Sequence, residues 1–176
     1  YAHQQGMIHR DLKPESVVLK TSAVIGPIVR YQPVLTDFTV AQQSSTGEIF
    51  VTDKPDTDFP YMSPEQCLGE RVDLRSDIYE LGVLLYEMLI GKPPYQPRSI
   101  AEAVRMHARE PLQPPTDFRE EIPDDLEKIV LKALEKNVNN RFQTAGDLSR
   151  ALQRSSVAAS NEGIGSARFT SVIVDN

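Results

Sequence analysis

The sequence predicts a mainly α-helical domain of the α+β class, in which a small β-element precedes four helices. Two short runs of β-branched and apolar residues, 17–19 and 33–38, come first and are typical of strands. From Ser76 onward the apolar residues recur at helical spacing instead. A chain of 176 residues is long enough to bury one hydrophobic core, so we expect a single domain.

The two expected strands are joined by a loop that contains Gly26 and Pro27. After the second strand, residues 41–60 are polar and rich in Ser, Thr and Asp, and glycine and proline interrupt them. This composition predicts a long surface loop. Long loops without secondary structure are uncommon in compact domains and are usually functional.

The first expected helix covers about 75–90 and is apolar on more than one face, which predicts deep burial. Gly91 and the prolines after it end this helix. Ser99 and Glu102 form a capping box that begins a second helix over roughly 99–109.

A third helix is indicated by five apolar residues at helical spacing behind an acidic first turn: Leu126, Ile129, Val130, Ala133 and Leu134. Thr144 and Asp147 begin a fourth helix with Leu148 and Leu152 on one side. Beyond Arg154 the chain is rich in Ser, Ala and Gly. We therefore expect a folded unit over 1–154 and a linker or tail over 155–176.

Composition excludes several functional classes. The net charge of -6 argues against a nucleic-acid partner, because such partners need clustered Lys and Arg. The longest apolar stretch, 81–91, is too short to span a bilayer and carries Glu87, so no membrane segment is expected in this piece. The single cysteine excludes an internal disulfide and is compatible with a reducing, cytoplasmic location. An anchor elsewhere in a longer protein remains compatible with this composition.

Three charged residues could support transfer of a polyanionic group to a hydroxyl. Asp11 could accept the hydroxyl proton, and Lys13, two residues later, could offset charge on the transferred group. Asp37 ends the next strand, where a carboxylate is well suited to hold Mg²⁺. Each aspartate taken alone is more often a solvated or capping residue.

Taken together, the motifs "HRDLKPE" (9–15), "DF" (37–38) and "SPE" (63–65) resemble the protein-kinase signature set in the same order. The segment "RSDIYELGVLLYEMLIGKPPY" (75–95) resembles the buried central helix of the kinase C-terminal lobe, and "NNRFQTAGDL" (139–148) resembles the segment with its late arginine. Lys13 is similar to the Ser/Thr branch of the family. The helical half is similar to bacterial kinases of the eukaryotic-like type.

The resemblance implies a kinase C-lobe, with a short β-hairpin around the catalytic loop followed by four helices and the N-lobe absent. It implies a transferase that uses ATP and Mg²⁺ to phosphorylate Ser or Thr of a protein substrate. The Gly-rich loop, strand lysine and helix glutamate of the N-lobe are not among these residues, so we expect the N-lobe to be a partner within a longer chain. By itself this piece is expected to be inactive.

The resemblance also implies roles for individual residues. Asp11 corresponds to the catalytic base and Lys13 to the lysine that stabilises the γ-phosphate, while Asp37 and Ser16 occupy the metal-binding positions beside the nucleotide. Arg10 corresponds to the arginine that pairs with a phosphorylated activation loop. Candidate phosphate acceptors in that loop are Ser44, Ser45, Thr46, Thr52 and Thr57. Structural roles are implied for three more residues: Asp77 corresponds to the aspartate that hydrogen-bonds the backbone of the catalytic loop, and Glu65 and Arg141 correspond to the buried ion pair of the family.

Three positions depart from the family pattern. Ser16 stands where the family has an asparagine, and its hydroxyl lies closer to the backbone than an amide oxygen does. Thr39 replaces a glycine and stiffens the hinge after Phe38. Asp58 replaces a threonine that contacts the catalytic aspartate, although Thr57 is adjacent. A pseudokinase that acts as a binding or scaffolding module is therefore the alternative interpretation.

Overall fold

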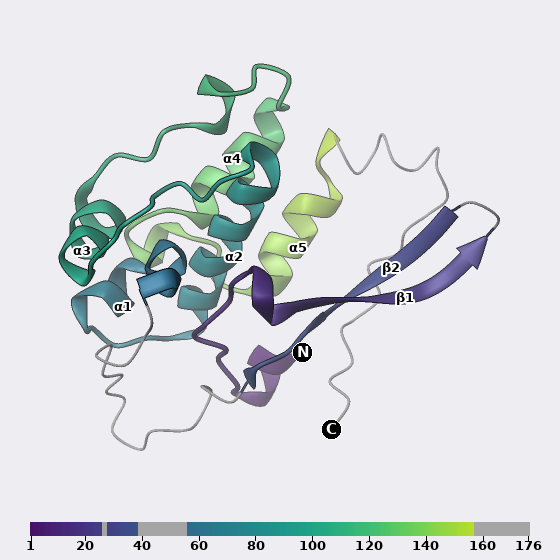
Figure 1. Cartoon of the computed structure of the whole chain (residues 1–176), viewed down its shortest axis with the longest axis horizontal. Helices are drawn as coiled ribbons and strands as arrows, with labels where there is room; N and C mark the ends of the chain where they lie inside the picture. The colour runs from purple at the N-terminus through teal and green to yellow at the C-terminus, as the bar shows by residue number, and fades with distance from the viewer. Residues whose placement is uncertain (26–27, 39–55, 157–176) are drawn as a thin grey trace.

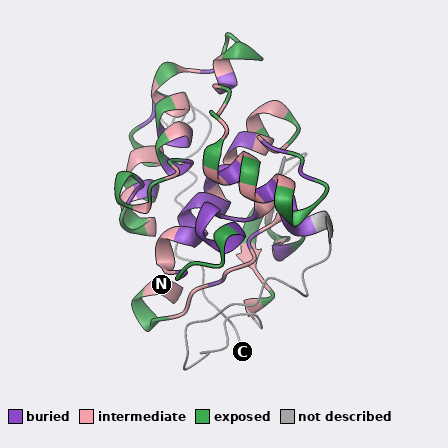
Figure 2. Cartoon of the chain, turned by 90° about the vertical axis from the view of Figure 1, so that its left-hand side faces the viewer, coloured by how far each residue is buried: buried purple, intermediate pink, exposed green. Residues whose placement is uncertain are grey.

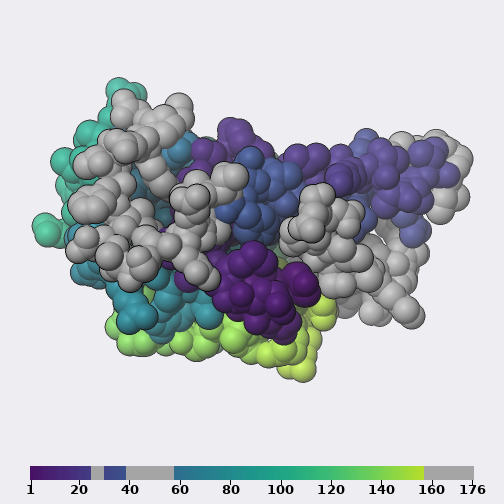
Figure 3. All heavy atoms as spheres, turned by 90° about the horizontal axis from the view of Figure 1, so that it is seen from below, coloured from purple at the N-terminus to yellow at the C-terminus, as the bar shows by residue number. Residues whose placement is uncertain are grey.

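A computed structural model describes residues 1–25, 28–38 and 56–156 of the chain. A β-hairpin follows the first 16 residues. Strand β1 (Val17–Ile25) pairs antiparallel with strand β2 (Ile28–Leu35), with Val17 opposite Leu35 and Lys20 opposite Gln32. The hairpin extends away from the helical body, as Figure 1 and the view from below in Figure 3 both show.

Both strands are longer than the apolar runs that predict them. The outer half of the hairpin pairs with itself and leaves large side chains in water, with Val24 66% and Tyr31 58% exposed. Because the helices bury neither face there, the sequence carries no apolar alternation from which these parts of the strands could be predicted. The connecting residues 26 and 27 lie outside the described residues.

The helical body contains five α-helices among the described residues. They are α1 (Pro64–Leu68), α2 (Leu74–Ile90), α3 (Ile100–Arg109), α4 (Asp124–Ala133) and α5 (Ala145–Gln153). Short 3₁₀ helices precede or connect them: Ala2–Gln5, Pro14–Ser16, Asp56–Tyr61, Pro115–Asp117 and Val138–Asn140. None of the described helices combines the length and the apolar character that a bilayer crossing requires.

Helix α2 forms the centre of the body, and its buried residues lie mainly between Ser76 and Val83. Figure 2 shows buried residues gathered in the middle of the molecule. Ile78, Tyr79 and Val83 are fully buried, each at 0% exposure. One side of α2 packs with α4 and α5, and the next side packs with α4, with Leu134 just after it, and with Tyr61 and Leu112. Gly82 allows α2 and α4 to approach each other closely, because a Cβ atom at this position would lie 3.0 Å from Cβ of Ala133.

The structure confirms the mainly helical fold class and contains all four of the expected helices. It adds α1, which the sequence interpretation missed. This helix has a complete capping box between Ser63 and Gln66 and ends at Gly69, whose φ is 67°. Of the expected long loop over 41–60, residues 56–60 belong to a 3₁₀ helix and the remainder lies outside the described residues.

Candidate active site

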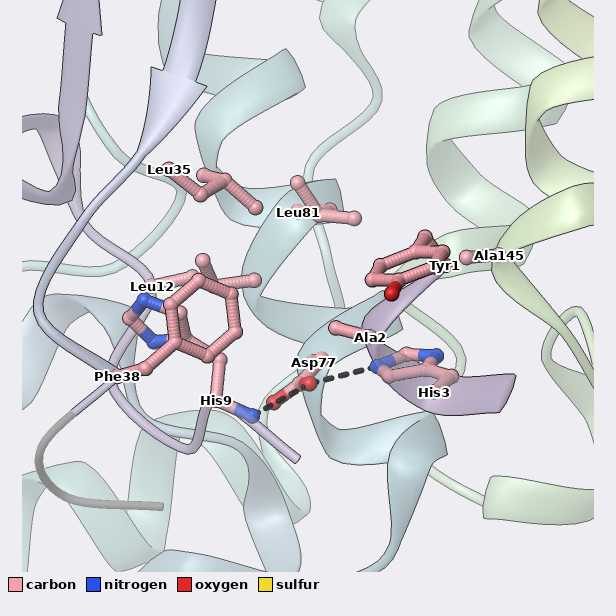
Figure 4. A pocket seen from close by; sticks show the side chains of 10 residues that line it. All are labelled: Tyr1, Ala2, His3, His9, Leu12, Leu35, Phe38, Asp77, Leu81 and Ala145. Carbon is pink, nitrogen blue, oxygen red and sulfur yellow. Dashed lines mark hydrogen bonds and ion pairs between the residues drawn. The ribbon is translucent and has the colours of Figure 1, made fainter. Parts of the chain in front are cut away.

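The segment 9–13 crosses the N-terminal half of α2, and Asp77 in the first turn of that helix holds it. Oδ2 of Asp77 accepts a hydrogen bond from the backbone N–H of His9, and Oδ1 accepts one from the N–H of Arg10, both at 2.8 Å. Nε2 of His3 donates to the same carboxylate at 2.7 Å (Figure 4). Asp77 therefore lies against the backbone of this loop, the position that the sequence predicts for it.

His9 connects this loop to the end of β2. Its Nε2–H donates to the carbonyl oxygen of Thr36 at 2.7 Å, and its ring contacts the Phe38 ring edge-on at a centroid distance of 4.7 Å. The two motifs "HRD" (9–11) and "DF" (37–38) are thus packed together by one buried imidazole.

Lys13 lies between two carboxylates. Its Nζ is 3.2 Å from Oδ2 of Asp11 and 2.9 Å from Oδ1 of Asp58. Partial burial lowers the pKa of Lys13, but the hydrogen bonds and charges of Asp58 and Asp11 outweigh burial and raise the pKa above its ordinary value. The ammonium therefore remains charged, and Asp58, which the sequence marks as a departure from the family, is brought next to Lys13.

Ser16 is fully buried, and its hydroxyl donates to the backbone carbonyl of Asp11 at 2.9 Å. The side chain of Ser16 therefore supports the backbone of the loop from the protein interior and is not open to a ligand.

Asp37 is exposed and has a left-handed backbone with φ of 63°. Its Oδ2 accepts a hydrogen bond from Oγ1 of Thr36 at 2.9 Å. An exposed carboxylate of this kind fits Mg²⁺ well, whereas the buried hydroxyl of Ser16 fits it poorly.

Glu65 and Arg141 form a bidentate ion pair with two N–O distances of 2.8 Å. Burial raises the pKa of Glu65, but Arg141 outweighs this effect, and the pKa is lowered overall. Arg141 also donates to the carbonyl oxygens of Glu135 and Arg75. The pair therefore connects α1, the start of α2 and the segment after α4, as expected of a structural ion pair.

The candidate regulatory residues can be placed only in part. Arg10 is half-buried and has φ of 69°, a left-handed conformation that is uncommon outside glycine. Ser44, Ser45, Thr46 and Thr52 lie outside the described residues, as does Thr39. Thr57 belongs to the 3₁₀ helix Asp56–Tyr61 that runs toward α1.

The sequence interpretation missed two residues that contact the loop. Glu80 accepts a hydrogen bond from the backbone N–H of Leu12 at 2.8 Å, and Nε2 of Gln66 donates to the carbonyl oxygen of Arg10 at 2.7 Å. Gln66 directly follows the quoted motif "SPE", and Glu80 lies within the quoted segment 75–95. The spacing of Glu80, one helical turn after Asp77, was an available signal.

A cavity of about 230 Å³ lies beside the loop and is lined in part by His9 and Leu12. Its lining is mostly apolar, and Figure 4 shows the side chains: Tyr1, Ala2, His3, His9, Leu12, Leu35, Phe38, Asp77, Leu81 and Ala145. Asp11, Lys13 and Asp58 do not line it, so this cavity is not the site of the proposed chemistry.

Comparison with known proteins agrees with this geometry. A sequence model described as the protein kinase domain matches residues 1–153. Serine/threonine-protein kinase PknB of Mycobacterium leprae is 40% identical over 155 residues, which cover 88% of this chain and 24% of that protein. A probable serine/threonine-protein kinase of Clostridium acetobutylicum is 35% identical over 148 residues, 84% of this chain and 21% of the relative. The chain thus spans between a fifth and a quarter of the length of these relatives.

Proposed function

Because this chain belongs to the protein kinase domain family, we propose that it forms the catalytic-loop region of a bacterial-type protein kinase that phosphorylates Ser or Thr of a protein substrate. The observation that carries this proposal is the arrangement of Asp11 and Lys13. A carboxylate and a charged ammonium lie 3.2 Å apart on a loop whose backbone is held by buried groups.

In this proposal Asp11 accepts the proton of the substrate hydroxyl as the hydroxyl oxygen attacks the γ-phosphorus of ATP. The bond between that phosphorus and the β–γ bridging oxygen breaks, and ADP leaves. Lys13 offsets negative charge on the group in transfer. Asp37 would hold Mg²⁺, which neutralises charge on the phosphates when it is bound. The rest of the nucleotide site would come from a kinase N-lobe, which these 176 residues do not supply. A cytoplasmic location belongs to the same proposal, because ATP is the phosphate donor.

A second candidate function is a binding module without phosphotransfer. Two observations favour it: Lys13 donates a hydrogen bond to Asp58, and the hydroxyl of Ser16 donates its proton to the carbonyl oxygen of Asp11. In that case the same fold would present its surfaces to a partner protein without transferring phosphate.

The test is phosphotransfer by the full-length protein and its Asp11→Asn variant, with a generic basic protein and labelled ATP as substrates. We expect the wild type to transfer phosphate and the variant to lose at least a hundredfold in rate, because the proton acceptor is gone while the side-chain volume stays the same. An equal melting temperature for both proteins is the control for folding. A wild type that transfers nothing at any Mg²⁺ concentration would instead support the binding module.

A further inference from the structure

We infer that Glu80 is a second positioning carboxylate of the catalytic loop and holds the peptide on the C-terminal side of Asp11. Its Oε2 accepts a hydrogen bond from the backbone N–H of Leu12 at 2.8 Å. Both residues are buried, Glu80 at 1% and Leu12 at 2% exposure. Water is therefore excluded from this bond.

Asp77 and Glu80 are three residues apart on α2, so they lie on the same face of the helix in adjacent turns. Asp77 binds the N–H groups of His9 and Arg10, and Glu80 binds that of Leu12. The two carboxylates thus hold the backbone on both sides of Asp11. This arrangement extends the loop contact of Asp77 by one helical turn.

The loop needs such partners because it cannot satisfy its own backbone groups. Arg10 adopts a left-handed conformation, which interrupts any regular hydrogen-bond pattern. Buried N–H groups that lack a partner are strongly disfavoured, and a carboxylate is a stronger acceptor than a neutral group. Helix α2 is a rigid support, since Ile78, Tyr79 and Val83 are fully buried.

The consequence for catalysis rests on the proposed function. If Asp11 is the proton acceptor, the position of its carboxylate depends on the backbone at Arg10 and Leu12. Loss of the Glu80 bond would let the loop move at Leu12, next to Asp11 and Lys13. It would leave intact the nucleotide contacts that the proposal assigns to Asp37 and to the N-lobe. The expected effect is on kcat more than on the KM for ATP, and a displacement of about 1 Å can cost up to a hundredfold in rate.

The experiment uses the full-length protein with Glu80→Ala and the conservative variant Glu80→Gln, whose amide oxygen can still accept from Leu12. Glu127→Ala is the matched control. Glu127 lies on α4 and, like Glu80, accepts a hydrogen bond from a backbone N–H, that of Thr116 at 2.7 Å. Amide hydrogen exchange of the peptide that contains residues 9–13 is measured beside steady-state kinetics for ATP.

We expect Glu80→Ala to speed exchange in this peptide by about tenfold or more, which corresponds to about 1.4 kcal/mol of lost protection. We also expect kcat to fall by about tenfold or more with a nearly constant KM. Glu80→Gln should recover most of both, and Glu127→Ala should change neither.

Unchanged exchange at residues 9–13 in Glu80→Ala would overturn the inference. An equal loss of kcat in Glu127→Ala would do so too, because it would point to a general effect on stability. The two proposals fail separately. A wild type without phosphotransfer removes the proposed function, while the exchange measurement still decides whether Glu80 holds the loop.

Discussion

At the scale of single residues, a short polar side chain at position 16 forms a backbone contact. The hydroxyl of Ser16 has one proton, and that proton goes to the carbonyl of Asp11. An asparagine has two amide protons and a separate oxygen, so it could brace the same carbonyl and still present an acceptor farther from the backbone. Ser16 therefore retains a structural contact but is poorly placed as a metal ligand.

We predict that Ser16→Asn raises the phosphotransfer rate of the full-length protein at low Mg²⁺. A gain of about tenfold corresponds to about 1.4 kcal/mol of transition-state stabilisation from a second, better-held metal ion. The measurement is a Mg²⁺ titration of wild type and variant. Ser16→Ala is the control, since it removes the hydroxyl and adds no ligand. Superimposable curves for wild type and Ser16→Asn would contradict the prediction.

Residue identity allowed much of the site to be predicted, and the structure shows where that stops. The family resemblance placed Asp11 and Lys13 on one loop and implied a pair between Glu65 and Arg141. In the structure Asp11 lies 3.2 Å from Lys13, and Glu65 forms an ion pair with Arg141. The resemblance could not place Asp58 beside Lys13, because that contact depends on how the 3₁₀ helix Asp56–Tyr61 folds back. Glu80 lies within the quoted segment 75–95, but its contact with the backbone of Leu12 is seen only in the structure.

At the scale of elements, the site depends on the close packing of α2 against α4. Gly82 faces α4, and the structure leaves little space beside it. Overpacking at such a contact would push α2 away from α4 and shift Asp77 and Glu80 with it. The helix that carries the loop-holding carboxylates is therefore fixed from its opposite side.

We predict that Gly82→Ala destabilises the protein by about 1–3 kcal/mol despite the better helix propensity of alanine. The new methyl group would meet Cβ of Ala133 and Cγ of Leu134 at 3.0 Å, and Ala133 can move only with its backbone. Chemical denaturation measures the change. Gly146→Ala is the matched control at an exposed position of α5, where the nearest atom is 3.4 Å away, and it should be neutral or stabilising. Equal effects of the two substitutions would show that packing at Gly82 is not limiting.

The elements were predictable where local signals exist. Helices α3 and α5 begin at the predicted residues, because the Ser99 and Thr144 side chains accept hydrogen bonds from the first turns. The full length of the hairpin was not predictable. The outer parts of β1 and β2 pair only with each other, away from the core, so no apolar alternation marks them in the sequence. Helix α1 has only five residues, too few for a periodic pattern.

At the scale of the whole molecule, a buried histidine connects three parts of the body. Nε2–H of His107 in α3 donates to the carbonyl of Phe59, and its Nδ1 accepts from the Tyr79 hydroxyl of α2. This arrangement requires the neutral imidazole. Burial, helped by the charge of Lys136 and only partly opposed by the hydrogen bond to Phe59, lowers the pKa of His107 to about 4.

We predict that this histidine makes the folded state sensitive to acid. Between pH 6.5 and about 4 the unfolded chain binds a proton at His107 and the folded chain does not, so stability falls as the pH drops through this window. The loss could reach about 3 kcal/mol by pH 4. Urea unfolding at several pH values gives the free energy of unfolding of wild type and His107→Gln as a function of pH. The carboxylates are common to both proteins, so their contribution cancels in the difference between the two curves. Parallel pH profiles would exclude His107 as the cause.

The Glu65–Arg141 pair also has a consequence for the order in which the chain is made. Its partners are 76 residues apart, and α2, α3 and α4 all lie between them. During synthesis Glu65 leaves the ribosome long before Arg141 exists, so α1 cannot bury its carboxylate with its partner until the segment after α4 has emerged. The carboxylate of Glu65 therefore stays hydrated during synthesis until Arg141, near the end of the helical body, has emerged.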